Sequence, residues 1–128
     1  MSDRDTTVRG DEPRPGFRAR LGASALVVVL SAERFGQSRV IGRETLTIGR
    51  GKDRALRIPD PAVSAEHCGI HAVDGGGYSI EDSGSTNGTF VNGRRIGGPV
   101  SLHYGDRITI GSTILRFFIE EKPEPTAG

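Results

Sequence analysis

Four polar residues in the middle of the chain have the chemistry to bind a phosphate or a carboxylate group. Arg50 directly follows a glycine at the end of an apolar run, and its planar guanidinium suits bidentate bonding to an oxyanion. Ser64 can donate a hydroxyl hydrogen, while Thr86 and Asn87 offer a hydroxyl and an amide on a glycine-supported loop. Each residue alone is also typical of an ordinary surface loop. Only their combination predicts a binding site.

The surroundings of these side chains do not favour catalysis or metal binding. Ser64 and His67 would need a third, orienting group and an oxyanion hole, and the Gly-x-Ser-x-Gly pattern does not occur. His67, Cys68 and His71 could suggest zinc, but on a strand Cys68 points away from the two histidines and no fourth ligand is nearby. The Gly49–Lys52 stretch lacks the spacing of a phosphate-binding loop. We predict no enzyme activity, no metal and no cofactor, and we interpret His67 as structural.

The rest of the sequence predicts the framework that positions these residues. Val and Ile outnumber Leu, and 19 glycines and 7 prolines interrupt the chain, which favours strands over helices. Asp74–Gly77 and Asn92–Gly93 are hairpin signals, and Ile108 and Ile110 alternate onto one face. We expect the apolar run Ala23–Leu30 to be a strand buried on both faces. The other expected strands are Val40–Ile41, Thr45–Ile48, Arg57–Ile58, His67–Val73, Tyr78–Asp82, Thr89–Val91, Arg95–Ile96, Arg107–Ile110 and Ile114–Ile119. So many short strands predict an all-β sandwich or barrel.

Charge and cysteine content limit the class of protein. With 17 basic and 16 acidic residues the net charge is +1, which does not indicate binding to nucleic acid or to a membrane surface. A single cysteine excludes an internal disulfide and suits a reducing compartment. The apolar runs are too short to span a membrane, and the polar start is unlike a signal peptide. We therefore expect a soluble, cytoplasmic protein.

Composition also predicts the domain boundaries. Residues 1–22 combine many charges with Pro and Gly and few apolar side chains, so we expect a disordered tail. Residues 120–128 have the same character and are expected to begin a linker or a C-terminal tail. The domain itself is expected to span residues 23–119.

In their order and spacing, the polar residues resemble the signature of the forkhead-associated (FHA) domain. The resemblance covers about residues 24 to 119, and it implies an FHA-like (SMAD/FHA) β-sandwich of about eleven short strands, of the bacterial signalling type. It further implies that loops at one end of the sandwich bind phosphothreonine produced by a Ser/Thr protein kinase. The residues that carry it are Gly49, Arg50, Ser64, His67, Asn87, Gly88, Asn92, Gly93 and the closing stretch Tyr104–Gly111.

The resemblance implies a role for each matching position. Arg50 and Ser64 would bind the phosphate, Thr86 would add a contact in the same pocket, and Asn87 would hold the main chain of the ligand. Loop shape would depend on Gly49, His67 and Gly88, with Asn92 and Gly93 forming a supporting hairpin turn.

One position departs from the family pattern. The residue after the serine is often basic or polar in FHA domains, but here it is Ala65, followed by Glu66. We therefore expect Lys52, Arg54 or Ser85 to support the site.

These features predict a phosphothreonine-dependent protein-binding module, either the sensor part of a larger regulator or a small adaptor. The alternative is a phospho-independent interaction scaffold that retains the FHA fold, which Ala65 favours. Thr6 and Thr7 are candidate phosphorylation sites, because the N-terminal tail is similar to those of small bacterial FHA regulators. In such proteins the phosphorylated tail binds its own domain. An inert tail is the other interpretation.

Overall fold

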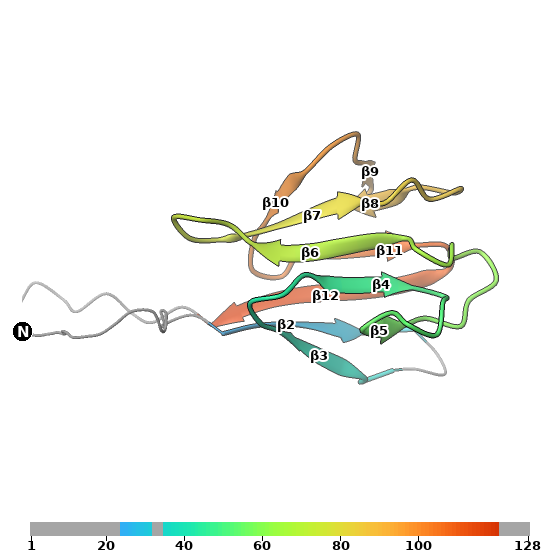
Figure 1. The fold of residues 1–128 in the computed structure, drawn as a ribbon, viewed down its shortest axis with the longest axis horizontal. Helices are drawn as coiled ribbons and strands as arrows, with labels where there is room; N and C mark the ends of the chain where they lie inside the picture. The colour runs from blue at the N-terminus through green and yellow to red at the C-terminus, as the bar shows by residue number, and fades with distance from the viewer. Residues whose placement is uncertain (1–23, 32–34, 121–128) are drawn as a thin grey trace, which may run out of the picture. The chain divides into compact units, whose positions relative to one another are not determined.

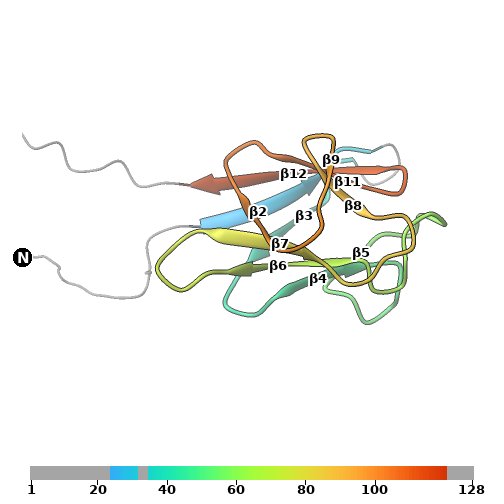
Figure 2. The same cartoon turned by 90° about the horizontal axis from the view of Figure 1, so that it is seen from above.

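Eleven strands form two facing sheets in the computed structural model, which describes residues 24–31 and 35–120 (Figure 1). Figure 2 shows the sheets as two layers. Within the described residues no helix is long and apolar enough to cross a membrane. The predicted all-β sandwich is confirmed. In sheet order, the first sheet contains β10 (Val100–Leu102), β7 (Tyr78–Asp82), β6 (Cys68–Ala72), β4 (Leu46–Gly49) and β5 (Leu56–Arg57). The second contains β3 (Ser38–Ile41), β2 (Ser24–Val29), β12 (Thr113–Glu120), β11 (Arg107–Ile110), β8 (Thr89–Val91) and β9 (Arg94–Arg95).

The predicted tails lie largely outside the described residues. This applies to residues 1–22, including Thr6 and Thr7, and to residues 121–128. Glu120 is the last residue of β12.

Apolar side chains from both sheets fill the space between the layers. Ile108 and Ile110 of β11 have no exposed surface, as their alternation predicts. Phe117 is also fully buried, and its ring lies 5.7 Å from that of Tyr78 on the opposite sheet. The remaining fully buried members of this core include Val27, Val29, Ile48, Leu56, Ile70, Ile80 and Leu115. A close-packed core of this kind holds the strand ends, and therefore the loops, in fixed places.

Two expectations about strands were wrong or incomplete. In β2, Ala25, Val27 and Val29 are buried, but Leu26 and Val28 are only half-buried, so the strand is not buried on both faces. The reason is that a two-layer sandwich covers one face of each sheet and leaves the other toward solvent. Strand β10 was not predicted, because three residues after Gly-Gly-Pro are too few to show alternation.

The Asn92–Gly93 turn has the geometry that this dipeptide favours. Val91 pairs with Arg94, which leaves a two-residue loop, and both loop residues have positive φ, 52° and 86°. The Asn92 side chain also donates to Asp106 Oδ1 (2.9 Å) and accepts from the Arg107 N–H (3.0 Å). These bonds fix the β8–β9 hairpin to the start of β11.

Strand register brings three loops together at one end of the sandwich. Cys68, the first residue of β6, pairs with Ile48 near the end of β4 and with Asp82 at the end of β7. The loops that adjoin these level strand ends therefore leave the same edge of the sheet, at the right-hand end in Figure 1. We refer to them together as the loop cluster. It consists of the β4–β5 loop (residues 50–55), the β5–β6 loop (58–67) and the β7–β8 loop (83–88).

Candidate functional site

Arg50 is the first residue of the loop cluster. Hydrogen bonds hold its main chain and the Nε atom of its side chain, while the rest of the guanidinium is exposed to solvent. The Arg50 N–H donates to Ser64 O (2.9 Å), and its side-chain Nε donates to Val63 O (2.9 Å). The side chain is exposed. Because Nε is occupied, the two terminal nitrogens of the guanidinium remain available to an oxyanion.

Gly49 permits the close contact between the β4–β5 and β5–β6 loops. A Cβ atom at this position would lie 2.2 Å from Ala65 O and 3.0 Å from Ser64 O, and both of these are backbone atoms. Only glycine leaves room for this approach. The contact places Arg50 next to Ser64, although the two residues are fourteen positions apart in the sequence.

Ser64, Thr86 and Asn87 connect the β5–β6 loop to the β7–β8 loop. The Thr86 N–H donates to Ser64 Oγ (3.0 Å), which leaves the serine hydroxyl hydrogen available to a ligand. Asn87 Nδ2 donates to Ala62 O (2.9 Å), which leaves Oδ1 and the second amide hydrogen on an exposed side chain. The side chains of Thr86 and Asn87 therefore stand beside Ser64 with hydrogen-bonding capacity unused.

His67 lies beneath this surface and is fully buried. Its Nδ1 accepts from the Ser64 N–H (3.0 Å), and its Nε2 lies 2.9 Å from Gly88 O. A main-chain N–H can only donate and a carbonyl can only accept, so the ring is the neutral tautomer with hydrogen on Nε2. His67 thus connects the β5–β6 loop to the β7–β8 loop by hydrogen bonds and is not exposed to solvent.

Asp82 organises the β7–β8 loop and was not identified from the sequence as a site residue. Its carboxylate accepts bonds from the hydroxyls of Ser85 (2.6 Å) and Thr89 (2.7 Å). It also accepts from the N–H groups of Gly84 and Ser85, both at 2.9 Å. Aspartate before a Ser-Gly-Ser stretch is typical of such a local turn, and this pattern was the available signal. Ser85 Oγ in turn accepts from the Gly88 N–H (2.9 Å), so Ser85 is directed into the loop.

Because Asp82 is stabilised in its charged form, the stability of the domain should fall at acidic pH. Partial burial alone would raise the pKa of this carboxyl, but hydrogen bonds from Ser85, Thr89 and the loop N–H groups lower it to about 2 from 3.8. Because the folded pKa is below the unfolded one, the stabilising effect is present above pH 4 and is lost as pH falls toward 2. After allowance for solvent screening, we expect a loss on the order of 1 kcal/mol.

Urea unfolding of wild type and Asp82→Asn at several pH values checks this prediction. The variant should be less stable at neutral pH and should show a shallower loss between about pH 5 and pH 2. Part of the acid sensitivity should remain in the variant, because hydrogen bonds from Ala62, Ser112 and Thr113 outweigh the effect of burial and lower the pKa of Asp60. Identical pH profiles for the two proteins would contradict the role given to Asp82.

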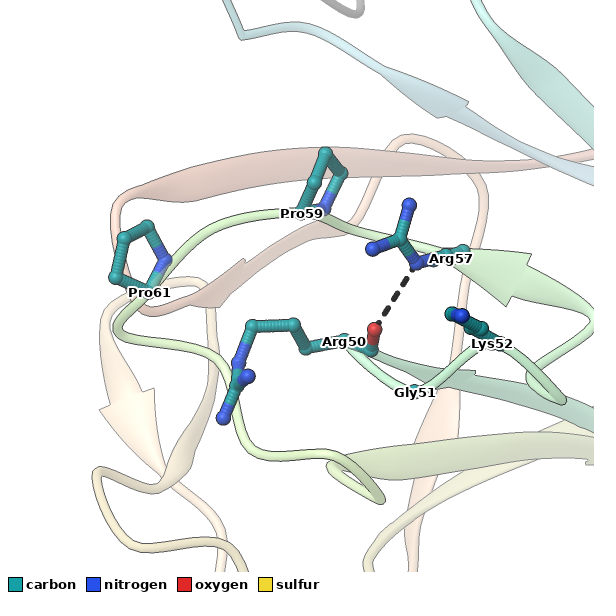
Figure 3. A pocket seen from close by; sticks show the side chains of 6 residues that line it. All are labelled: Arg50, Gly51, Lys52, Arg57, Pro59 and Pro61. Atoms are coloured by element: carbon teal, nitrogen blue, oxygen red, sulfur yellow. Dashed lines mark hydrogen bonds between the residues drawn. The ribbon is translucent and has the colours of Figure 1, made fainter.

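The basic residues of the β4–β5 loop have different surroundings. Lys52 is exposed and, with Arg50, lines a surface hollow of about 660 Å³ (Figure 3). Arg54 does not line it; its guanidinium lies 3.8 Å from the Glu66 carboxylate. Arg57, which was predicted only as the start of a strand and not as a site residue, also lines the hollow. Its position could not be read from the sequence, because it depends on the parallel pairing of β5 with β4.

The sequence of this chain is similar to those of known proteins. The model of the FHA domain family matches residues 46–111, which contain the whole loop cluster and the Asn92–Gly93 turn. Glycogen accumulation regulator GarA of Mycolicibacterium smegmatis is 33% identical over 109 residues, which is 85% of this chain and 68% of GarA. Angiogenic factor with G patch and FHA domains 1 of Mus musculus is 41% identical over 91 residues. That match covers 64% of this chain and 13% of the mouse protein, so the chain spans a small part of that relative.

A solved structure extends the likeness to the fold. It comes from a structural and functional analysis of phosphothreonine-dependent FHA domain interactions, and it superposes with a TM-score of 0.67 at 29% identity. The superposition covers 80% of this chain and 98% of that structure.

Proposed function

Because this chain belongs to the forkhead-associated (FHA) domain family, we propose that it is a phosphothreonine-dependent protein-binding module in Ser/Thr kinase signalling. The observation that carries the proposal is the convergence of Arg50 and Ser64, which hydrogen bonds place next to each other in the loop cluster and which both keep unused donors. A phosphothreonine has three acceptor oxygens and a charge of about −1.5 to −2 at neutral pH. Donors on two rigidly connected loops can bind such a group without large ordering costs.

The neighbouring residues supply the rest of the proposed site. Thr86 would add a hydroxyl contact to the phosphate, and the free amide groups of Asn87 would bond to the main chain of the ligand. Gly49, His67 and Gly88 would hold the loops in position, while Lys52 would add positive charge at the rim without contacting the phosphate itself. Ser85, bonded within its own loop, would act through that loop and not by direct contact.

The proposed partners follow from this ligand. They are a phosphothreonine-containing protein, the Ser/Thr kinase that modifies it and, within the same chain, phosphorylated Thr6 or Thr7. The FHA family consists of non-catalytic binding modules, and we propose binding without catalysis here as well. A ligand made by Ser/Thr protein kinases supports a cytoplasmic location for the proposed function. The module would act as the sensor part of a larger regulator or as a small adaptor.

The alternative is a phospho-independent interaction scaffold, and Ala65 is the residue that favours it. Ala65 is exposed and offers no side-chain donor. Its carbonyl accepts from the Gly51 N–H (3.1 Å), so its contribution is to loop structure.

An NMR titration of the isotope-labelled protein with a phosphothreonine peptide pool tests the proposal. We expect shifts in the amides of Arg50, Ser64 and Thr86, because these groups lie at the proposed phosphate contact. The Gly75–Gly77 turn should not respond, since it lies at the opposite end of β6 and β7 (Figure 1). Equal shifts with the unphosphorylated pool would support the scaffold alternative. Shifts confined to other surfaces would contradict both the site and the mechanism.

A further inference from the structure

The hollow beside Arg50 is lined by more positively charged side chains than are needed to bind a single phosphate group. Its volume is about 660 Å³, and three of its lining residues are the cations Arg50, Lys52 and Arg57, all exposed. The remaining lining residues are Gly51, Pro59 and Pro61, so no carboxylate of residues 24–31 or 35–120 lines the hollow. The prolines have fixed φ and no N–H, and they form a rigid wall without competing donors.

Arg57 is held in position by the main chain of its neighbour. It pairs with Gly49 across the parallel β4–β5 ladder, and its Nε donates to Arg50 O (3.1 Å). The adjacent residue in β5, Leu56, is fully buried. Because neighbouring side chains in a strand point to opposite faces, Arg57 is directed outward. This bond leaves both terminal nitrogens of the Arg57 guanidinium available for a planar anion, as the Val63 bond does for Arg50.

The two guanidinium groups face different parts of the surface. Figure 3 shows the Arg50 side chain extending toward the loop that follows Pro61, while the Arg57 guanidinium lies near Pro59. Lys52 is on the Arg57 side of the Arg50 main chain in the same view. A phosphate held by Arg50 and Ser64 would therefore leave Arg57 and Lys52 without an anion.

Among the residues that the structure describes, no carboxylate forms an ion pair with Lys52 or Arg57. The nearby Glu66 carboxylate lies 3.8 Å from the Arg54 guanidinium instead. Two adjacent cations that face a shared hollow favour a ligand with negative charge at that point. Both side chains are exposed, so the gain from one ion pair should be modest.

We propose that Arg57 and Lys52 form a second anion subsite, which binds a carboxylate or a second phosphate on the same peptide as the phosphothreonine. This inference rests on the proposed function, and it names a ligand class within it: phosphothreonine segments with an additional negative charge nearby. Arg57 determines this preference because its guanidinium is fixed by the bond to Arg50 O. Lys52 adds charge from a more flexible side chain.

Calorimetry with defined phosphothreonine peptides tests the subsite. The reference peptide carries alanine at all positions except the phosphothreonine. One series of peptides introduces a single aspartate at each position on either side of the phosphothreonine. A second series replaces that aspartate with phosphoserine, which distinguishes a carboxylate from a second phosphate. At the position that reaches the subsite, wild type should bind about three- to tenfold more tightly than it binds the alanine peptide.

Arg57→Gln should remove this preference and leave the affinity for the alanine peptide unchanged. Arg43→Gln is the matched control, since Arg43 is an exposed arginine in the turn before β4, at the opposite end of that strand from Arg50. The control makes the same change in net charge and should retain the preference. Thermal unfolding checks that both variants are folded.

The possible outcomes separate this inference from the proposed function. If wild type binds the alanine peptide but no added anion improves binding, the second subsite is wrong and phosphothreonine binding stands. A preference that persists in Arg57→Gln, or that disappears equally in Arg43→Gln, also overturns the subsite. If no phosphothreonine peptide binds to wild type, both proposals fail.

Discussion

Replacing Gly49 with alanine is expected to destabilise the domain by about 3 kcal/mol. The added Cβ would lie 2.2 Å from Ala65 O and 2.9 Å from Ala65 C, so backbone must move to accommodate it. That movement would break the bonds from the N–H groups of Arg50 and Gly51 to the carbonyls of Ser64 and Ala65. The same change would separate Arg50 from Ser64, and we expect phosphopeptide binding to fall with stability. Urea unfolding followed by circular dichroism measures the first effect.

Gly42→Ala is the matched control for this prediction. Gly42 does not have a positive φ, and a Cβ at this position would meet no heavy atom within 4 Å. The substitution should therefore stabilise the domain slightly, by up to about 1 kcal/mol, because alanine restricts the unfolded chain. If the two variants unfold at the same urea concentration, the close contact between Gly49 and Ala65 does not contribute to the stability of the domain as predicted.

Local patterns in the sequence predicted most of the strands and two hairpin turns, Asp74–Gly77 and Asn92–Gly93. The alternation of Ile108 and Ile110 identifies the buried face of β11, and Asn92–Gly93 predicts a two-residue turn, because such signals depend only on neighbouring residues. The prediction for β2 was wrong because an apolar run does not reveal how many layers cover it. Three residues after a proline gave no usable pattern for β10.

The candidate site was predictable only in part. Arg50, Ser64, Thr86 and Asn87 were identified as a set by their resemblance to a family. Asp82 was not, because the Asp-Ser-Gly-Ser pattern indicates a local turn but not the four hydrogen bonds that Asp82 accepts in the folded β7–β8 loop.

The surroundings of the basic residues also required the structure. Arg54 lies 3.8 Å from the Glu66 carboxylate, a contact that the sequence did not indicate, and its support for the site stays a prediction. Arg57 was overlooked because its proximity to Arg50 depends on the β4–β5 register. Residues whose function depends on strand pairing or on loop conformation are difficult to identify from local sequence patterns.

Replacing Arg50 with alanine is expected to weaken phosphothreonine peptide binding about a hundredfold, or about 2.7 kcal/mol. The terminal nitrogens of its guanidinium would make charge-assisted bonds to the phosphate, and each such bond contributes roughly 1.5–3 kcal/mol. Stability should fall by no more than about 1 kcal/mol, because the bond that is lost in the folded protein, Nε to Val63 O, belongs to an exposed side chain. Isothermal titration calorimetry and urea unfolding measure the two effects separately.

Arg50→Lys distinguishes charge from geometry at the same position. Lysine retains the positive charge but lacks the planar fork, so we expect it to recover only part of the lost affinity. Arg43→Ala, at the other end of β4, should bind as wild type does. Equal affinities for wild type and Arg50→Ala would exclude Arg50 from the phosphate contact.

The comparison of one peptide pool in its phosphorylated and unphosphorylated forms tests the central claim most directly. Calorimetry with wild type should give a Kd on the order of micromolar, about 8 kcal/mol, for the phosphothreonine pool and no measurable binding for the unphosphorylated pool. Equal affinity for the two pools would contradict the claim that this domain recognises phosphothreonine.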